Sequence, residues 1–529
     1  MKKNLYFGIT LSLAFAAASC SMDFEPTGAY SDKTFWYSAK NAESGLTGCF
    51  LPLRNGSMFG GMSIAMEECA TPNAYNYANT LSWNDIAKGS HTADGTVIAG
   101  RWKDAYTGIG RCNMLLANID QSKELSSEEI TQMKAQARFL RALYYSVLTT
   151  YYYSAPLITD APDISQVDQP RAERATMIQF ILDELEAISK ILPRSYTSAD
   201  LGRPTAGAAL ALRARILLFE ASELCNPDHN EEAWRAAADA AYAVMELGVY
   251  SLYQNGYAEL FTETAEHSSE SIFNVEFVSN PTGLGHSIDI VMRQYNSAAP
   301  LKNFVDSYWM KDGKPREESA YADSPAYEDL DPRFAQTIVY PGSVWMGETV
   351  KTDNTNVRFT NKQTGFIYKK YTVYTEQVPS DEEFGLKEIC SPINIMLLRY
   401  ADVLLMYAEA KNELGELTEE VWNRTIKAIR QRAGFTSSAA LAYPGNNPDE
   451  LRRLIRYERR IEFAGEGTYY NDLRRWREAE TVMNNLNIYT FDGTLIGTRN
   501  FNKERDYWWP VPSAEIEIAP SLRPNNPGW

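Results

Sequence analysis

Runs of apolar residues at helical spacing constrain the fold of this chain more than any other feature. Between residues 134 and 153 apolar side chains recur every three to four positions, and Pro156 follows the run. Similar runs predict further helices over residues 176–192, 205–222, 234–247, 395–414, 421–433 and 448–464. Two pairs of these runs have short connections, as in antiparallel helical hairpins that stack into right-handed arrays. We therefore predict a mainly α fold with a superhelical frame.

Two long stretches of the chain lack this periodicity. Residues 247–391 are rich in Gly, Pro, Asn, Asp, Tyr and Trp and hold one short candidate strand at 272–277, and residues 52–101 have the same texture. Long irregular segments are costly to order and usually carry function. No Ser/Gly-rich or Pro-rich linker divides the chain. We predict a single domain over residues 20–529, in which a helical frame (about 100–250 and 391–480) supports two loop-rich ligand regions (about 52–101 and 247–391).

The first residues differ from the rest of the chain. Lys2 and Lys3 precede an apolar run over residues 5–18, and small residues lead up to Cys20. This pattern is typical of a bacterial signal peptide over residues 1–19. We expect Cys20 to become an acylated N-terminus that anchors the protein to a membrane. The alternative is an ordinary secreted protein in which Cys20 is incidental.

Cysteine spacing and net charge exclude several classes of site. The other five cysteines are widely spaced without a C-x-x-C pair, so we predict no disulfide framework and no zinc site. Instead we expect them to be buried small hydrophobic residues. The formal net charge of −17 argues against nucleic acid and against an anionic membrane face as partners. An uncharged or cationic ligand is easier to accommodate.

Candidate catalytic groups are few. The four histidines include no metal-ligating pair, and Glu348 occupies the position where a phosphate loop needs lysine, so we interpret residues 342–349 as a surface turn. Glu458 with Glu462, and Glu409 with Glu413, could serve glycoside hydrolysis as carboxylate pairs. Neighbouring arginines favour ion pairs between helices instead, because they lower a carboxylate pKa that a general acid needs raised. We predict no catalytic residue, no metal and no cofactor.

Aromatic residues in the loop-rich regions are the candidate ligand contacts. Tyr and Trp rings stack on the apolar faces of sugar rings, and amide side chains hydrogen-bond sugar hydroxyls. For any one ring, packing in the protein core is the commoner role. The candidate ligand-binding residues are Tyr75, Tyr77, Trp83, Asn84, Tyr295, Trp309, Trp345 and Tyr368.

Several segments carry a family resemblance. They are ARFLRALYY at 137–145, GRPT at 202–205, LRYADVLLMYAEA at 398–410, IRYERRIEF at 455–463, DLRRW at 472–476 and WPVP at 509–512. In these segments, and in their order and spacing, the chain resembles the SusD/RagB family of nutrient-binding outer-membrane lipoproteins. The resemblance extends over essentially the whole chain.

This resemblance implies a tetratricopeptide-like helical frame with an irregular ligand-binding half. It also implies a non-catalytic protein, anchored in the outer membrane and facing the cell exterior, that captures oligosaccharide or polysaccharide. The captured glycan would pass to a SusC-like TonB-dependent transporter. Two alternatives stay open at this point. One is a surface lipoprotein that binds peptide cargo or acts as a protein-interaction scaffold, and the other is a glycoside hydrolase that uses Glu458 or Glu409.

Overall fold

The computed structural model describes residues 32–197, 200–278, 284–351, 364–372 and 391–529. The predicted signal peptide and the lipidation site Cys20 lie outside these residues, as does Cys390. Within the described residues, no helix combines the length and the apolar character needed to cross a membrane.

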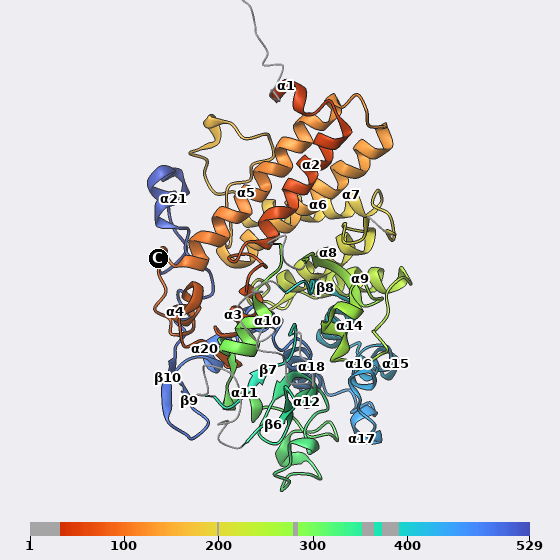
Figure 1. The fold of residues 1–529 in the computed structure, drawn as a ribbon, viewed down its shortest axis with the longest axis vertical. Coiled ribbons are helices and arrows are strands. Elements are labelled where there is room, and N and C mark those ends of the chain that lie inside the picture. Colours follow the sequence, from red (N-terminus) through yellow and green to blue (C-terminus); the bar gives the residue numbers. More distant parts are fainter. Residues whose placement is uncertain (1–31, 198–199, 279–283, 352–363, 373–390) are drawn as a thin grey trace, which may run out of the picture.

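A chain of long helices forms the frame of the protein (Figure 1). Successive helices from α5 to α9 pack each against the next, α14 packs on α9 and α8, and α18 packs on α14. This arrangement is the mainly α, tetratricopeptide-like frame that the sequence predicts. The long helices are α2 (Ala39–Phe50), α5 (Thr96–Asn118), α6 (Ser127–Tyr152), α7 (Arg174–Ser189), α8 (Ala206–Ala221), α9 (Glu231–Glu246), α14 (Tyr400–Glu413) and α18 (Pro448–Glu462).

Helix α6 shows how local sequence sets a frame helix. Its first turn is closed by a capping box, in which the Ser126 hydroxyl accepts from the Glu129 amide at 3.2 Å and the Glu129 carboxylate accepts from the Ser126 amide at 2.7 Å. The helix ends at Tyr152, and the next residue, Tyr153, has a positive φ of 71° that does not continue the helix. Between these ends, Phe139 and Leu140 are fully buried. The prediction of a helix over 134–153 is confirmed, although the helix begins one to two turns earlier.

Two other predicted helices are interrupted. The run 395–414 begins as strand β8 (Ile395–Arg399), which pairs antiparallel with β2 (Ser271–Val275), and only then becomes α14. The run 421–433 is divided into α15 (Glu419–Arg424) and α16 (Ile426–Ala433) by Thr425, which has a non-helical ψ of −92°. Periodicity alone does not separate a buried strand from a buried helical turn, so the prediction of one continuous helix over 395–414 was wrong.

Short elements fill the other half of the molecule. The remaining short helices are α1 (Asp32–Phe35), α3 (Ser63–Glu68), α4 (Trp83–Ala87), α10 (Ile288–Ile290), α11 (Lys302–Val305), α12 (Arg333–Thr337), α17 (Ser438–Leu441), α19 (Tyr469–Arg475), α20 (Ala479–Val482) and α21 (Ser513–Ile518). In the described part of the chain, four further antiparallel ladders join β1 (Ala74–Tyr75) to β3 (Ala299–Pro300), β4 (Ile338–Val339) to β7 (Ile367–Tyr368), β5 (Val344–Trp345) to β6 (Glu348–Thr349), and β9 (Leu486–Tyr489) to β10 (Leu495–Arg499). Ladder β5–β6 is a tight hairpin, in agreement with the turn predicted over 342–349.

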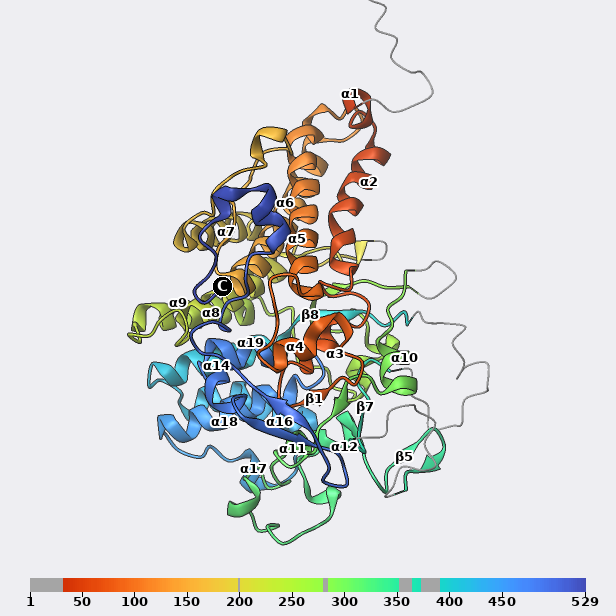
Figure 2. The same cartoon turned by 90° about the vertical axis from the view of Figure 1, so that its left-hand side faces the viewer.

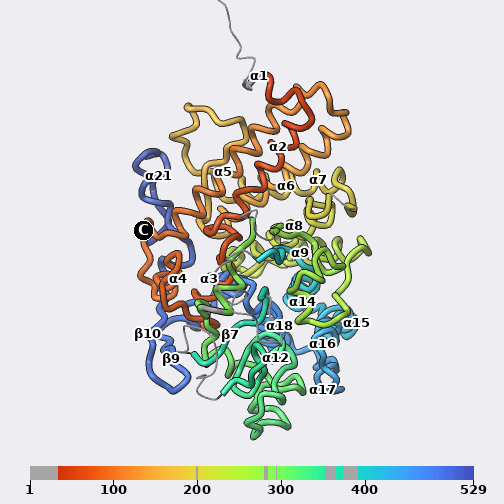
Figure 3. Tube along the Cα trace, in the orientation of Figure 1, coloured from red at the N-terminus to blue at the C-terminus, as the bar shows by residue number. Residues whose placement is uncertain are grey.

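The C-terminal segment folds back onto the frame (Figure 2). The Trp509 amide donates to the Tyr151 carbonyl at 2.7 Å, and its fully buried ring lies 5.6 Å from that of Trp83. Figure 3 shows the C-terminal trace, in blue, beside α4 and α5. The first helices and the last residues therefore share one core. The cysteines at 49, 69 and 112 are buried free thiols, as expected, and Cys225 is partly buried.

Candidate functional site

The carboxylates considered for catalysis are buried in ion pairs. Glu458 accepts hydrogen bonds from Arg333 and Arg430, both at 2.8 Å. Although burial raises the pKa of Glu462, the neighbouring Arg432 and Arg399 outweigh it and lower that pKa to about 2. The pKa of Glu409 is also lowered. Burial raises this pKa, but the neighbouring Arg475 outweighs burial.

These shifts have the opposite sign from that required of a general acid. The interpretation of the glutamates as helix-locking ion pairs is confirmed. Arg459, which lies within i,i+3 reach of Glu462, pairs instead with Asp402 at 2.9 Å and with Asp472 at 3.0 Å.

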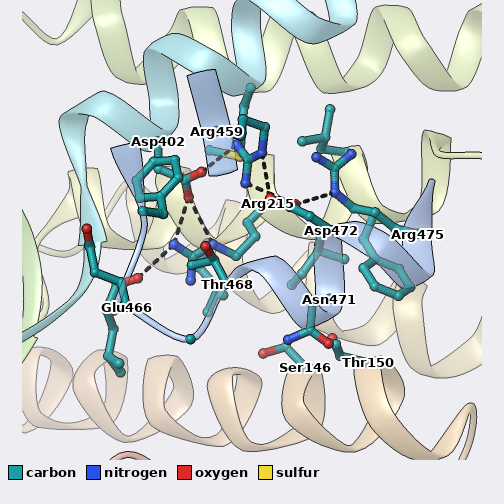
Figure 4. Close-up of a pocket in the computed structure, with 18 of the residues that line it drawn as sticks. Ser146, Thr150, Arg215, Asp402, Arg459, Glu466, Thr468, Asn471, Asp472 and Arg475 are labelled. Carbon is teal, nitrogen blue, oxygen red and sulfur yellow. Dashed lines mark hydrogen bonds and ion pairs between the residues drawn. The ribbon is translucent and has the colours of Figure 1, made fainter. Parts of the chain in front are cut away.

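An interior cavity lies between the frame helices α6 and α8 and the C-terminal helices (Figure 4). Its volume is about 160 Å³. Arg215 and Asp402 pair across it at 2.7 Å, and Arg475 pairs with Asp472 at 2.8 Å. Small-molecule sites typically measure about 300–1,000 Å³. This cavity is too small for an oligosaccharide, and its charged groups are already paired with one another, so we do not assign it as the ligand site.

The two loop-rich regions meet at the ladder between β1 and β3. Tyr75 pairs with Ala299, and the Asn76 side-chain amide donates to the Ser297 carbonyl at 2.6 Å. Tyr77 is 40% exposed, while Tyr75 and Tyr295 are partly buried. At this junction, which we call the tyrosine junction, the segment that carries Tyr75 and Tyr77 lies beside the segment that follows Tyr295.

Asn84 belongs beneath the tyrosine junction rather than on its surface. The residue is 3% exposed, and its side-chain amide donates to the Asn76 carbonyl. Asn76 in turn accepts from the Thr80 amide at 2.8 Å through its own side chain. Asn84 therefore shapes the loop that carries Tyr77.

Three of the candidate aromatic residues are closed off from solvent. Trp83 is 0% exposed and packs edge-on against Trp509, with the Arg101 guanidinium 5.4 Å from its ring centroid. Trp345 belongs to a small apolar cluster, and Tyr368 lies fully buried beside Phe304. Their burial agrees with a role in packing the protein core, so we do not include these three residues in the proposed site.

Trp309 lines an open hollow of about 600 Å³. Its partly buried ring is stacked on Tyr457 of α18, with centroids 3.9 Å apart and planes 6° from parallel. Arginines at i, i+4 and i+8 of α18, which are Arg452, Arg456 and Arg460, line the same hollow. From the sequence, the arginines of this helix were interpreted only as ion-pair partners. Their spacing of four residues nevertheless shows that these side chains share one helix face.

Comparisons with known proteins place the chain in a family. A model of the SusD family matches residues 264–529, which is half of the chain. The chain belongs to the SusD family. A second model, described as starch-binding associating with outer membrane, matches residues 58–218 of this SusD family protein.

Relatives of this SusD family protein match it over nearly its full length. SusD-like protein P25 of Formosa agariphila is 23% identical over 96% of each chain. A SusD-like carbohydrate binding protein from Bacteroides fragilis has 28% identity and a TM-score of 0.77, covering 93% of this chain and 100% of that one. Surface glycan-binding protein A from Bacteroides fluxus shares the fold, with a TM-score of 0.69, 19% identity and coverage of 93% and 100%.

Proposed function

We propose that this protein is a non-catalytic surface lipoprotein that captures oligosaccharide or polysaccharide and delivers it to a SusC-like TonB-dependent transporter. The observation that carries the proposal is the whole-chain similarity to a SusD-like carbohydrate binding protein at 28% identity. The buried, ion-paired state of Glu458 and Glu462 supports a binding role over glycoside hydrolysis.

The tyrosine junction is the proposed glycan contact. An exposed Tyr77 with partly buried Tyr75 and Tyr295 offers ring faces for C–H groups of a sugar and hydroxyls for its polar edge. Asn84 and the β1–β3 ladder hold these loops in place. Because the rings come from two distant segments, the folded chain is needed to assemble the contact.

Binding of the soluble form, starting at Ser21, to a polysaccharide panel tests the proposal. Affinity electrophoresis identifies a glycan, and calorimetry measures its affinity. Tyr77→Ala and Tyr295→Ala each remove one ring and are expected to weaken binding about threefold to tenfold. Tyr153→Ala is the matched control, because Tyr153 is similarly exposed (42%) but lies at the end of frame helix α6.

A panel without any bound glycan, together with a peptide that binds, would contradict the proposal and favour peptide cargo. Stable association with the transporter and no small ligand at all would favour the scaffold alternative. Sugar release by the purified protein, abolished by Glu458→Gln, would establish the hydrolase alternative.

Membrane anchoring is tested separately at Cys20. The described chain begins at Asp32, a short segment after Cys20, so an acylated Cys20 would hold the folded protein close to the membrane. The outer-membrane description of the matching family model supports this location. Cys20→Ala is expected to move the protein from the membrane fraction to the soluble fraction. Retention of Cys20→Ala in the membrane fraction would contradict the lipid anchor.

A further inference from the structure

The hollow beside Trp309 has aromatic residues in its floor and guanidinium groups in its wall. Tyr457 and Tyr469 are buried, and Trp309 stands partly exposed above Tyr457. The Arg453 guanidinium lies 5.7 Å from the Trp309 ring centroid. Arg316 also lines the hollow.

Most of the arginines in the hollow have carboxylate partners. Arg452 is paired with Glu413 at 2.7 Å, and Arg453 with Glu318 at 3.0 Å. The remaining pairs are Arg456 with Glu223 (2.7 Å) and with Glu478 (2.6 Å), and Arg452 with Asp449 (2.5 Å). Lining carboxylate Asp306 is itself paired with Lys302 at 2.6 Å. These groups neutralise one another and set the shape of the wall.

Arg316 and Arg460 are different. Arg460 donates from Nε to the Asn73 side-chain oxygen at 2.9 Å and lies over the rings of Phe304 and Tyr469. Arg316 donates through Nη1 to the Ser324 carbonyl at 2.6 Å. Among the residues that the structure describes, neither arginine forms an ion pair with a carboxylate.

These hydrogen bonds to a side-chain oxygen and a backbone carbonyl orient both guanidinium groups without neutralising their charge. Glu317 is the remaining acidic residue of the lining, and it is exposed to solvent. The hollow therefore holds two uncompensated positive charges against one solvated negative charge.

We infer that this hollow is a second saccharide site and that it takes sugars bearing an anionic group, a carboxylate or a sulfate ester. The inference rests on the proposed function in one respect, that the protein binds saccharides. A guanidinium group presents paired N–H donors that match the oxygens of a carboxylate or sulfate. Trp309 supplies the apolar surface for the sugar ring. A volume of about 600 Å³ lies within the usual range for small-ligand sites.

The net charge of −17 does not prevent this binding. Screening at physiological salt limits the reach of distant charges to about 8 Å. The groups inside the hollow, rather than the total charge, then decide which ligand it accepts. The preference for uncharged or cationic ligands inferred from total charge does not extend to this site.

Calorimetry with three oligosaccharides of equal length tests the inference on the soluble chain. The probes are an oligogalacturonate, which carries carboxylates, a sulfated galactan oligosaccharide, and a neutral oligosaccharide that the panel identifies. The variants are Arg316→Gln and Arg460→Gln. Arg235→Gln is the matched control, because it makes the same charge change at an exposed arginine of α9 that pairs with Glu416.

At least one acidic probe is expected to bind, with an affinity about tenfold to a hundredfold weaker in Arg316→Gln and Arg460→Gln than in wild type. Arg235→Gln is expected to match wild type, and the affinity for the neutral probe is expected to stay unchanged in all three variants. The acidic probe that loses affinity distinguishes a carboxylate site from a sulfate site. Thermal melts of each variant confirm folding, and Arg316, in a surface 3-10 turn, provides the variant in which folding is least affected.

Neutral binding without binding of either acidic probe would overturn this inference and leave the proposed function intact. Equal losses in Arg316→Gln and Arg235→Gln would also overturn it. Absence of binding to every saccharide would contradict the proposed function and this inference together.

Discussion

At the scale of single residues, Glu462 shows how this protein tolerates charge in its core. The side chain is 0% exposed and accepts from Arg399 at 2.7 Å and from Arg432. These two partners come from β8 and α16, and a third, Arg333, comes from α12 at 3.4 Å. A buried carboxylate costs several kcal/mol unless it is paired, and removing one partner of such a group is strongly destabilising. Glu462 is therefore a structural residue that joins four elements.

The lowered pKa of Glu462 predicts a pH dependence of stability. Its folded pKa is about 2 against an ordinary 4.5, so its contribution is present above about pH 4.5 and is lost as the pH falls toward 2. A shift of this size corresponds to about 3 kcal/mol. Urea unfolding at pH 6 and pH 3 measures it.

Glu462→Gln is expected to lower the free energy of unfolding at pH 6 by about 3–5 kcal/mol and to reduce its dependence on pH. Glu450→Gln, at an exposed position of the same helix, is expected to follow wild type. The same acid sensitivity in Glu462→Gln as in wild type would contradict this account.

At the scale of elements, close helix packing depends on small residues. A Cβ atom at Gly108 of α5 would lie 2.2 Å from the buried ring of Tyr144 in α6. The Tyr144 hydroxyl donates to the Cys49 carbonyl of α2 at 2.7 Å, so the ring is held from both sides. Gly108 is what allows the three helices to pack around this tyrosine.

Replacing glycines of α5 by alanine separates helix propensity from packing. Gly110→Ala is expected to be neutral or to stabilise by up to about 1 kcal/mol, because its Cβ would meet only Pro162 at 3.4 Å. Gly108→Ala is expected to destabilise by about 1–3 kcal/mol through overpacking. Chemical denaturation of the two variants checks the difference. Equal stability of both would show that Tyr144 moves aside freely.

At the scale of the whole molecule, the frame and the loop-rich half share one core and are joined by buried ion pairs. A continuous set of buried apolar residues runs from Trp36 to Leu522. Arg399 of β8 reaches Glu270, ahead of β2, at 2.9 Å and Glu466, after α18, at 2.8 Å. Each half therefore needs the other to bury its apolar side chains and to pair its buried charges.

This continuity predicts one cooperative unfolding transition. Far-ultraviolet circular dichroism and tryptophan fluorescence are expected to give coincident denaturation curves. Trp509→Ala, which empties a site between α4 and α6, is expected to lower stability by about 3–5 kcal/mol and to shift both curves together. Two separated transitions would show that the halves unfold independently.

The sequence by itself determined the long frame helices. For the helices predicted over 134–153 and 448–464, the sequence signals are the apolar periodicity, the capping residues and the helix breakers. These signals lie within a few residues of one another, because helical hydrogen bonds are local. The family motifs, which lie mostly on the frame, could be recognised for the same reason. The ion-pair role of Glu458 and Glu462 was predicted from arginines on the same helix, but the arginines that pair with these glutamates come from α12, α16 and β8.

Only the tertiary structure decided which aromatic rings are buried and which are exposed. The strand β8 exists because β2 pairs with it from far earlier in the chain, and Trp83 is buried because Trp509 returns from the C-terminus to cover it. The tyrosine junction and the hollow at Trp309 likewise combine segments that are distant in sequence. Burial of a ring and pairing of a strand depend on such distant partners, whereas the hydrogen bonds of a helix depend on residues four positions away.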